Sequence, residues 1–368
     1  MGNKINRVAR IKQVTKKQYT QDKFKKLKEI GKGSFGKVYL VEEKETGKIF
    51  AMKVLVKKEM IKRKQIKNLL TEHELLEKIK CPFIVDFHSS FQNKEKIFFV
   101  MEYLSGGDLY DRLNIDQTFS EERVLLYAAS IIMALQTIHE YGAIYRDLKP
   151  ENILIDDDGY LKLIDFGLSK ILKSKNKRKT KYQKCKTCCG TLEYIAPEVI
   201  LGEKYGTEAD YWSLGIILYE MLHGMPPFYS DNKNEMYEKI INDEPKISTS
   251  VSSEMQNLIR QLLNKNPEKR LGSHSRSQNI RDHPIITKLD WQLMLKKQYQ
   301  PEFIPKSNEL YNSQVNSEQS FQEKSKSLYN TKKNDKTVLL DQSNLLKFKG
   351  FSSTRKDTQV LQNIITYK

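Results

Sequence analysis

Short apolar runs separated by turn signals dominate the N-terminal part of the chain. Three strand-like runs span 24–30, 37–43 and 49–56. A glycine-rich stretch separates the first two runs, and the turn at Thr46-Gly47 separates the second from the third. Short runs joined by tight connections are typical of β-hairpins, so the pattern predicts an antiparallel meander of three strands. Two more strand candidates, 84–91 and 97–104, flank a turn at Asn93-Lys94.

Helical periodicity replaces this pattern further along the chain. Apolar residues recur at three- and four-residue spacing between Ile66 and Leu76, and Pro82 ends the pattern. After Gly106-Gly107 the helical stretches become longer, over 122–142 and 210–224. The sequence therefore predicts an α+β fold with a small β-rich lobe followed by a larger helical lobe.

Composition divides the chain into a folded domain and two appendages. The hydrophobic content is 39%, below the roughly 45–50% that is usual in compact domains, so part of the chain lies outside the core. Basic residues dominate 1–23, whereas Lys, Ser, Asn and Gln dominate 284–368. We expect a basic N-terminal arm over 1–23, a folded domain over 24–283 and a partly disordered tail over 284–368 that wraps or tethers.

The charge and the cysteine content narrow the class of protein. The chain carries 63 Lys and Arg against 46 Asp and Glu, a formal charge of +17. Such an excess favours partners that bear phosphate, namely nucleotides, nucleic acid or an anionic membrane. No run approaches the ~20 apolar residues of a membrane-spanning helix, and the N-terminus lacks the apolar run of a secretion signal. With only four cysteines, we expect a cytoplasmic protein with free thiols.

The glycine-rich stretch between the first two strands is the first candidate binding feature. It consists of Gly31, Lys32, Gly33, Ser34, Phe35 and Gly36, with Val38 shortly after. Without side chains, backbone N–H groups can close over phosphate oxygens. A strand follows the stretch, whereas a dinucleotide-binding unit requires a helix there. Taken alone, the motif leaves an ordinary glycine-containing hairpin equally open.

Later motifs supply the groups that phosphoryl transfer needs. They are Ala51-Met52-Lys53 on the third strand, Glu72 on the following helix, YRDLKPEN at 145–152, Asp165-Phe166-Gly167, and Ala196-Pro197-Glu198. Phosphoryl transfer depends on positioning and electrostatic stabilisation. This set offers a lysine with a carboxylate partner, an aspartate for a substrate hydroxyl, and oxygen ligands suited to Mg²⁺. In order over 24–283, the motifs resemble those of the eukaryotic protein kinases.

Three details resemble the AGC group of that family, which contains protein kinases A, B and C. They are Tyr145 in place of the commoner histidine, the run CGTLEYIAPEV at 189–199, and the element FKGFS at 348–352. The resemblance implies a bilobal kinase fold, an AGC-type tail with its hydrophobic motif at 348–352, and a serine/threonine kinase that uses ATP and Mg²⁺.

The resemblance assigns a role to each matched residue. Asp147 orients the acceptor hydroxyl and takes its proton, and Lys149 neutralises the γ-phosphoryl group. Lys53, held by Glu72, anchors the α- and β-phosphates, while Asn152 and Asp165 bind the metal. The adenine pocket is assigned to Val38, Ala51, Met101, Glu102, Leu104 and Leu154. A hydrophobic column that links the lobes is assigned to Leu76, Phe87, Tyr145 and Phe166, and an ion pair to Glu198 and Arg270.

Acidic residues indicate the substrate class. Asp108, Glu151 and Glu220 match positions that surround the peptide site in kinases that prefer basic sequences. In a chain this basic, an acidic cluster at the cleft would create a local field of the opposite sign. We therefore expect protein substrates with Arg or Lys before the acceptor Ser or Thr.

Two residues match phosphorylation sites of the group. Thr187 matches the activation-loop site, where an upstream kinase would add a phosphate able to pair with Arg146 and Lys170. Ser352 matches the site of the hydrophobic motif, although Ser353 replaces a usual aromatic residue and predicts weaker docking. The lysine-rich stretch between Lys170 and Lys186 would repel itself until Thr187 is phosphorylated. Alternatively, this stretch would dock an anionic partner.

The N-terminus and the rival functions complete the expectations. Gly2 and the basic arm predict N-myristoylation with contact to an anionic membrane, although Asn6 departs from the motif. A catalytically silent kinase-fold scaffold would need a lesion among the catalytic residues, and none is present. A nucleic-acid-binding function lacks a stacking motif or a zinc module, and the CxxC at Cys185-Cys188 has no second ligand pair. We expect a monomer.

Overall fold

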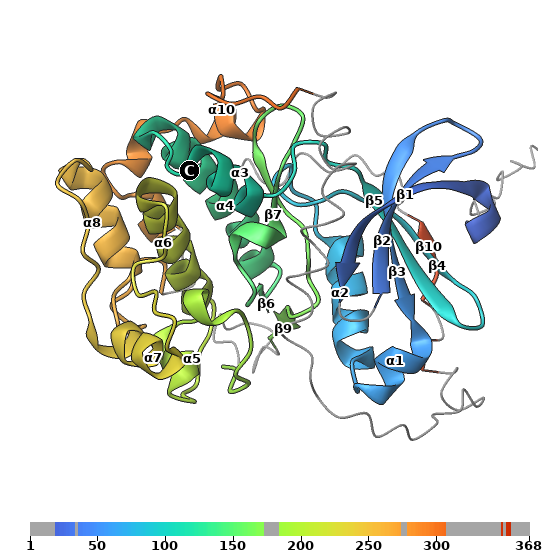
Figure 1. Cartoon of the computed structure of the whole chain (residues 1–368), viewed down its shortest axis with the longest axis horizontal. Helices are drawn as coiled ribbons and strands as arrows, with labels where there is room; N and C mark the ends of the chain where they lie inside the picture. The colour runs from blue at the N-terminus through green and yellow to red at the C-terminus, as the bar shows by residue number, and fades with distance from the viewer. Residues whose placement is uncertain are drawn as a thin grey trace, which may run out of the picture.

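A computed structural model of the chain describes residues 19–33, 36–172, 184–273, 278–306, 347–348 and 351–354. They form a small β-rich lobe beside a larger helical lobe (Figure 1). The predicted α+β bilobal fold is therefore confirmed. In the part of the chain described, no helix combines the length and apolar character needed to cross a bilayer.

An antiparallel sheet forms the small lobe. Its strands are β1 (Phe24–Gly33), β2 (Gly36–Glu43), β3 (Ile49–Val56), β4 (Phe87–Gln92), β5 (Lys96–Glu102) and β10 (Ser353–Thr354), arranged in the order β1-β2-β3-β5-β4-β10. The first three strands form the predicted meander. Two helices follow β3, namely α1 (Lys57–Lys62) and α2 (Ile66–Lys78). The α2 helix buries Leu69, Leu75 and Leu76 in the core, as its apolar spacing predicts.

Two long helices form the centre of the helical lobe, α4 (Glu121–Glu140) and α6 (Glu208–His223). Ser120 caps α4 by accepting a hydrogen bond from the Arg123 N–H, and Gly224 ends α6 at φ 81°. Around them lie α3 (Leu109–Asp116), α5 (Pro197–Ile200), α7 (Lys233–Asn242), α8 (Ser253–Leu262), α9 (Gln278–Arg281) and α10 (Trp291–Leu295). The pairs β6 (Ala143–Ile144) with β9 (Lys170–Ile171) and β7 (Ile153–Ile155) with β8 (Leu161–Leu163) complete the lobe.

A column of apolar side chains crosses from one lobe to the other. Leu76 and Phe87 come from the small lobe, and Tyr145 and Phe166 come from the helical lobe. All four are buried in the same core cluster. The rings of Tyr145 and Phe166 meet edge to face with centroids 5.5 Å apart. The lobes therefore share packed side chains next to the catalytic motifs.

The expected ion pair between Glu198 and Arg270 is confirmed. Both side chains are almost fully buried, and the two guanidinium nitrogens donate to the two carboxylate oxygens at 2.7 and 2.8 Å. Arg270 also donates to the backbone oxygens of Glu208 and Asn264. This bidentate pair ties the start of α5 to the segment after α8.

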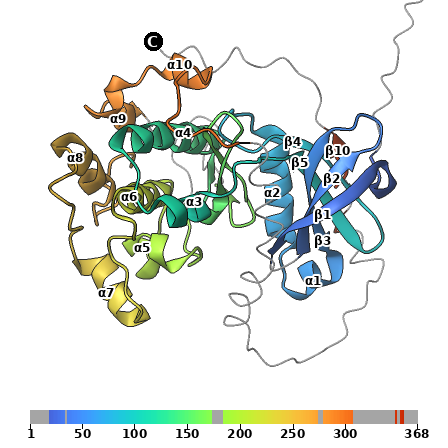
Figure 2. The same cartoon turned by 45° about the horizontal axis from the view of Figure 1, so that its top comes forward.

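The tail contacts both lobes. On the helical lobe, Phe303 lies beneath the guanidinium groups of Arg112 and Arg123, at 4.3 and 5.1 Å from its ring centroid. On the small lobe, Phe348 and Phe351 are almost fully buried. In the turned view of Figure 2, β10 lies beside β4 at the edge of the sheet. The docking of both phenylalanines on the small lobe agrees with the expectation for the hydrophobic motif.

Candidate functional site

A lysine bridges two carboxylates at the junction of the lobes. The Lys53 ammonium group on β3 donates to Glu72 Oε1 of α2 at 2.7 Å and to Asp165 Oδ1 at 3.1 Å. Asp165 precedes the turn in which Gly167 N–H also donates to its Oδ1, at 2.9 Å. The fold therefore brings together three residues that are far apart in the sequence, one from each of three motifs.

The YRDLKPEN loop places its polar side chains around Asp147. The Asn152 amide donates to the Asp147 carboxylate at 2.7 Å and to the Asp147 backbone oxygen at 2.9 Å. Lys149 Nζ lies 3.4 Å from the same carboxylate and donates to Thr191 Oγ1 at 2.9 Å. Because both Asn152 contacts use its NH₂ group, its side-chain oxygen is left as the atom able to bind a metal.

Asp210 of α6 holds this loop in place. Its carboxylate accepts hydrogen bonds from the backbone N–H groups of Tyr145 and Arg146 and contacts the His139 ring at 2.7 Å. Arg146 has a φ of 70°, which non-glycine residues rarely adopt. Backbone strain of this kind persists only where the surroundings hold it, so Asp210 is a positioning residue of the catalytic loop.

The surroundings of Asp147 and Asp165 shift the pKa values of these two carboxyl groups in opposite directions. Burial raises the pKa of Asp147, and nearby Lys149 opposes the shift only in part. Burial is also the largest effect on Asp165, but there the Lys53 ammonium, the Gly167 N–H and the charge of Lys149 together outweigh it and lower the pKa of the carboxyl group. Lys53 itself keeps a raised pKa despite its burial because two carboxylates face it. Asp147 is thus the stronger base of the two, and Asp165 gives up its proton more readily.

Three of the residues assigned to the nucleotide, Val38, Ala51 and Met101, lie on neighbouring strands of the small-lobe sheet. In the sheet register, Ala51 lies opposite Met101 and Val38 lies opposite Lys53. At Gly36, an added Cβ would lie 1.8 Å from the Val54 carbonyl oxygen, so the end of the glycine-rich stretch cannot carry a side chain there. Ser34 and Phe35 lie outside the described residues.

An ion pair spans the hinge between the lobes. Lys162 of β8 donates to both carboxylate oxygens of Glu102, at 2.6 and 2.8 Å. Glu102 also accepts a hydrogen bond from the Asp86 N–H. Leu104, two residues after Glu102, is buried. Leu154 forms an isolated β-bridge with Asp108. The segment that joins the two lobes is therefore tied to the helical lobe by this ion pair and this bridge.

Three acidic side chains form a connected field near the catalytic loop. Burial raises the pKa of Glu220 to about 7, although Tyr194 donates to it at 2.8 Å. Burial likewise raises the pKa of Asp108, which caps α3, to about 6. The charge of exposed Glu151 raises the pKa of both groups, so Glu151 lies close enough to each of them to act on its ionisation.

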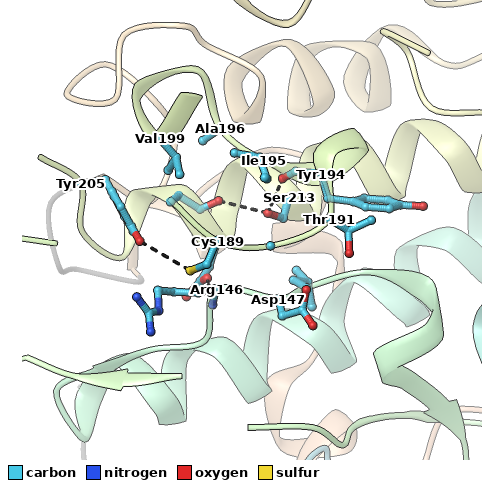
Figure 3. Close-up of a pocket in the computed structure, with 14 residues that line it drawn as sticks. Arg146, Asp147, Cys189, Thr191, Tyr194, Ile195, Ala196, Val199, Tyr205 and Ser213 are labelled. Carbon is cyan, nitrogen blue, oxygen red and sulfur yellow. Dashed lines mark hydrogen bonds between the residues drawn. The ribbon is translucent and has the colours of Figure 1, made fainter. Parts of the chain in front are cut away.

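The activation segment is anchored through Tyr205. Its hydroxyl donates to the Thr187 backbone oxygen at 2.6 Å and lies 4.0 Å from Cys189 Sγ. Tyr205 and Cys185 also form an isolated antiparallel bridge. Figure 3 shows Tyr205, Cys189 and Arg146 around a cavity of about 20 Å³, which has room for about one water molecule. The Thr187 side chain is exposed, and 173–183, most of the lysine-rich stretch, lies outside the described residues.

Four residues that sequence reasoning did not select help to position the site, namely Asp210, Lys162, Thr191 and Tyr205. Asp210 carries a usable signal, because a carboxylate at the start of an apolar helix needs a buried partner. The other three are ordinary polar residues in sequence, and only the fold shows their contacts. The four cysteines, Cys81, Cys185, Cys188 and Cys189, are free thiols, as expected.

The comparisons with known proteins decide the family. The profile described as "Protein kinase domain" matches residues 24–286. The chain belongs to the protein kinase family. It is 46% identical to serine/threonine-protein kinase sgk-1 of Caenorhabditis elegans over 82% of its length, and 43% identical to the RAC family serine/threonine-protein kinase homolog of Dictyostelium discoideum over 77%. These similarities confirm the AGC resemblance.

The kinase chain spans 65% and 62%, respectively, of the length of these two relatives. It is also 45% identical to protein kinase 2 of Dictyostelium discoideum and spans 59% of that protein. Membership of the family implies use of ATP with a divalent metal. The site fits that pair, because Asn152 and Asp165 carry side-chain oxygen atoms suited to a divalent metal and Lys53, a cation suited to phosphate, donates to Asp165 at 3.1 Å.

Proposed function

We propose that the chain is an active serine/threonine protein kinase that transfers the γ-phosphate of ATP, with Mg²⁺ as its metal. The observation that carries this proposal is the convergence of Lys53, Glu72 and Asp165 next to the Asp147 loop. A silent scaffold would keep the fold without these contacts. The division into an arm at 1–23, a catalytic domain at 24–283 and a tail at 284–368 is part of the proposal.

Each contact supports one step of the transfer. Asp147, with its raised pKa, accepts the proton of the substrate hydroxyl, and Asn152 fixes its orientation. Lys149 lies beside the acceptor and offsets negative charge on the transferred group. Lys53, held by Glu72, anchors the α- and β-phosphates. Asn152 and Asp165 would hold Mg²⁺, which would offset negative charge on the phosphates of ATP.

The acidic residues support a preference for basic substrates. Glu151 is exposed and Asp108 is partly exposed, whereas Glu220 is only 7% exposed and accepts a hydrogen bond from Tyr194. Arginine can pair with such carboxylates in bidentate geometry. Protein substrates with Arg or Lys before Ser or Thr therefore fit this face of the kinase.

The affinity for an arginine-containing peptide should increase with pH. Between pH 6 and pH 8, Glu220, with a pKa of about 7, and Asp108, with a pKa of about 6, lose their protons. The two carboxylates that form then attract the arginine of the peptide. We expect the KM for that peptide to fall by about tenfold relative to a peptide without arginine. The Glu220→Gln variant should flatten this difference. Equal pH profiles for the two peptides would contradict the role of the acidic residues.

An oriented peptide library tests the proposed function directly. The full chain, with and without phosphate on Thr187, is incubated with ATP, Mg²⁺ and the library. We expect phosphate on Ser or Thr after upstream Arg or Lys, and more product with phosphorylated Thr187. Failure of both forms to phosphorylate any peptide would favour the silent scaffold.

Regulation by phosphorylation rests on the environment of Arg146. Its Nη1 atom is buried and has no hydrogen-bond partner among the described residues, and its Nε donates to Leu168 O at 2.6 Å. A phosphate on exposed Thr187 would give this guanidinium and Lys170 an anionic partner. An upstream kinase would supply that phosphate, and Ser352, which is exposed, is a second acceptor.

Membrane contact is the last part of the proposal. Gly2 and most of the basic arm lie outside the described residues. A myristoyl chain binds membranes only marginally alone, and the lysines of the arm would supply the second signal. A mass spectrum of the native N-terminus with an unmodified Gly2 would remove this idea.

A further inference from the structure

The docked tail departs from the AGC pattern at one buried position. Ser353 replaces the aromatic residue that the pattern leads one to expect, yet it is only 7% exposed. In β10 it pairs with Ser90 of β4, and Thr354 pairs with Ser89. The tail therefore extends the small-lobe sheet and buries a hydroxyl at its edge. A buried hydroxyl needs hydrogen-bond partners.

Ser353 finds these partners in a compact polar cluster. His73 Nε2 lies 2.8 Å from Ser90 Oγ and 3.0 Å from Ser353 Oγ. The Ser353 N–H donates to Ser90 Oγ at 3.2 Å, and Ser90 Oγ donates to the Phe351 backbone oxygen at 3.0 Å. His73 and Ser90 of the small lobe and Ser353 of the tail thus provide hydrogen-bond partners for one another. We name His73, Ser90 and Ser353 the polar latch.

Aromatic rings surround the polar latch. The His73 ring lies 4.5 Å from the Phe351 ring and 6.0 Å from those of Phe87 and Phe99, measured between centroids. Burial lowers the pKa of His73, although the charges of Glu77 and Glu74 oppose the shift. Both hydroxyls face the same ring nitrogen, Nε2. Because Ser90 donates its own proton to the Phe351 backbone oxygen, an Nε2–H group of the neutral ring can be shared between the two hydroxyl oxygens. The latch is therefore a polar site within an apolar groove.

We propose that the polar latch selects the tail of this kinase by the Ser353 hydroxyl and the His73 ring, in place of the aromatic anchor of the AGC pattern. His73 directly follows Glu72 on α2, so the helix that holds Lys53 also contacts the tail. The occupant is the segment around Phe348–Ser353 of this chain. The groove discriminates against tails with an aromatic residue at position 353.

Two physical effects produce this discrimination. An alanine at position 353 would leave His73 with one hydroxyl partner fewer in a buried site, where unmade hydrogen bonds are costly. A phenylalanine would additionally have to displace His73 or Ser90, because both lie within hydrogen-bond distance of the Ser353 oxygen. Overpacking a closed site of this kind is destabilising. Ser353 thus contributes to docking through fit as well as through hydrogen bonds.

Peptide binding to an emptied groove tests the proposal. In the full chain, Phe348→Ala and Phe351→Ala together remove both apolar anchors of the tail. A fluorescent peptide of residues 345–356 is then titrated, with anisotropy as the readout. We expect tight binding of the native peptide, about tenfold weaker binding of a Ser353→Ala peptide and a larger loss for Ser353→Phe. A Ser352→Ala peptide is the matched control and should bind like the native one, because Ser352 is exposed.

A second variant separates the latch from general packing. In a chain that also carries His73→Leu and Ser90→Ala, the native and Ser353→Ala peptides should bind with the same affinity, because both partners of the Ser353 hydroxyl are gone. A preference for Ser353 that persists in this variant would overturn the proposal. Equal binding of these two peptides to the His73 form, or tighter binding of Ser353→Phe, would also overturn it. The readout is binding alone, so it does not depend on the proposed phosphotransfer.

Discussion

Asp147→Asn should lower the rate of phosphotransfer by about 10²–10⁴-fold while nucleotide affinity stays near that of the wild type. The Asp147 carboxylate is held by the Asn152 amide at 2.7 Å and has a raised pKa, which suits a base. Asparagine has nearly the same shape but cannot accept the proton of a substrate hydroxyl. Lys53, Glu72 and Asp165 remain in place to hold the nucleotide.

Single-turnover kinetics on a basic peptide would measure this loss, and nucleotide titration would check binding. Asp243→Asn is the matched control, since Asp243 is exposed at the end of α7, and it should leave the rate unchanged. An Asp147→Asn variant that keeps most of the wild-type rate would show that this carboxylate is not the base.

Glu198→Gln should lower the free energy of unfolding by about 3–5 kcal/mol, because it leaves the buried Arg270 guanidinium without a counter-charge. Both side chains are at most 1% exposed, so water cannot replace the lost carboxylate. The two backbone oxygens that Arg270 also contacts keep it in the interior. The substitution therefore lowers the stability of the folded state. It should not change the rate of catalysis in molecules that stay folded.

Urea titration at neutral pH would measure this change. Glu235→Gln is the control, because Glu235 forms a similar pair with Lys239 at 2.7 Å on the exposed surface of α7. Its midpoint should stay close to that of the wild type, since water screens exposed pairs. Equal shifts for the two variants would contradict the special role of the buried pair.

The architecture of the small lobe was predictable from the chain because its signals are local. Alternating runs and the turn at Thr46-Gly47 define β1 to β3, and the structure has these strands within a few residues of the predicted bounds. The α2 helix and the long α4 and α6 helices follow from apolar spacing in the same way. Two-residue strands such as β6 and β10 carry no such signal, because they form only where distant segments meet.

The site could be predicted only as a set of residues. The motifs name Lys53, Asp147 and Asp165. The fold places Lys53 against Asp165 and brings Asp165 close enough to Asp147 for its charge to raise the pKa of Asp147, but their catalytic roles stay predictions. The supporting contacts were hidden from the sequence. Asp210 binds the loop from 63 residues beyond Asp147 in the numbering, and Lys162 meets Glu102 across the hinge. Such pairs depend on tertiary structure and have no local pattern.

The constraint that Asp210 places on Arg146 bears on how the kinase matures during synthesis. The catalytic loop takes a conformation that its own residues disfavour, and the group that enforces it belongs to α6, which the ribosome delivers later. A nascent chain that ends before α6 therefore contains Lys53, Glu72 and Asp165 but lacks the carboxylate that holds the backbone at Tyr145 and Arg146. The loop around Asp147 takes its final conformation only once α6 has been made and has packed against it.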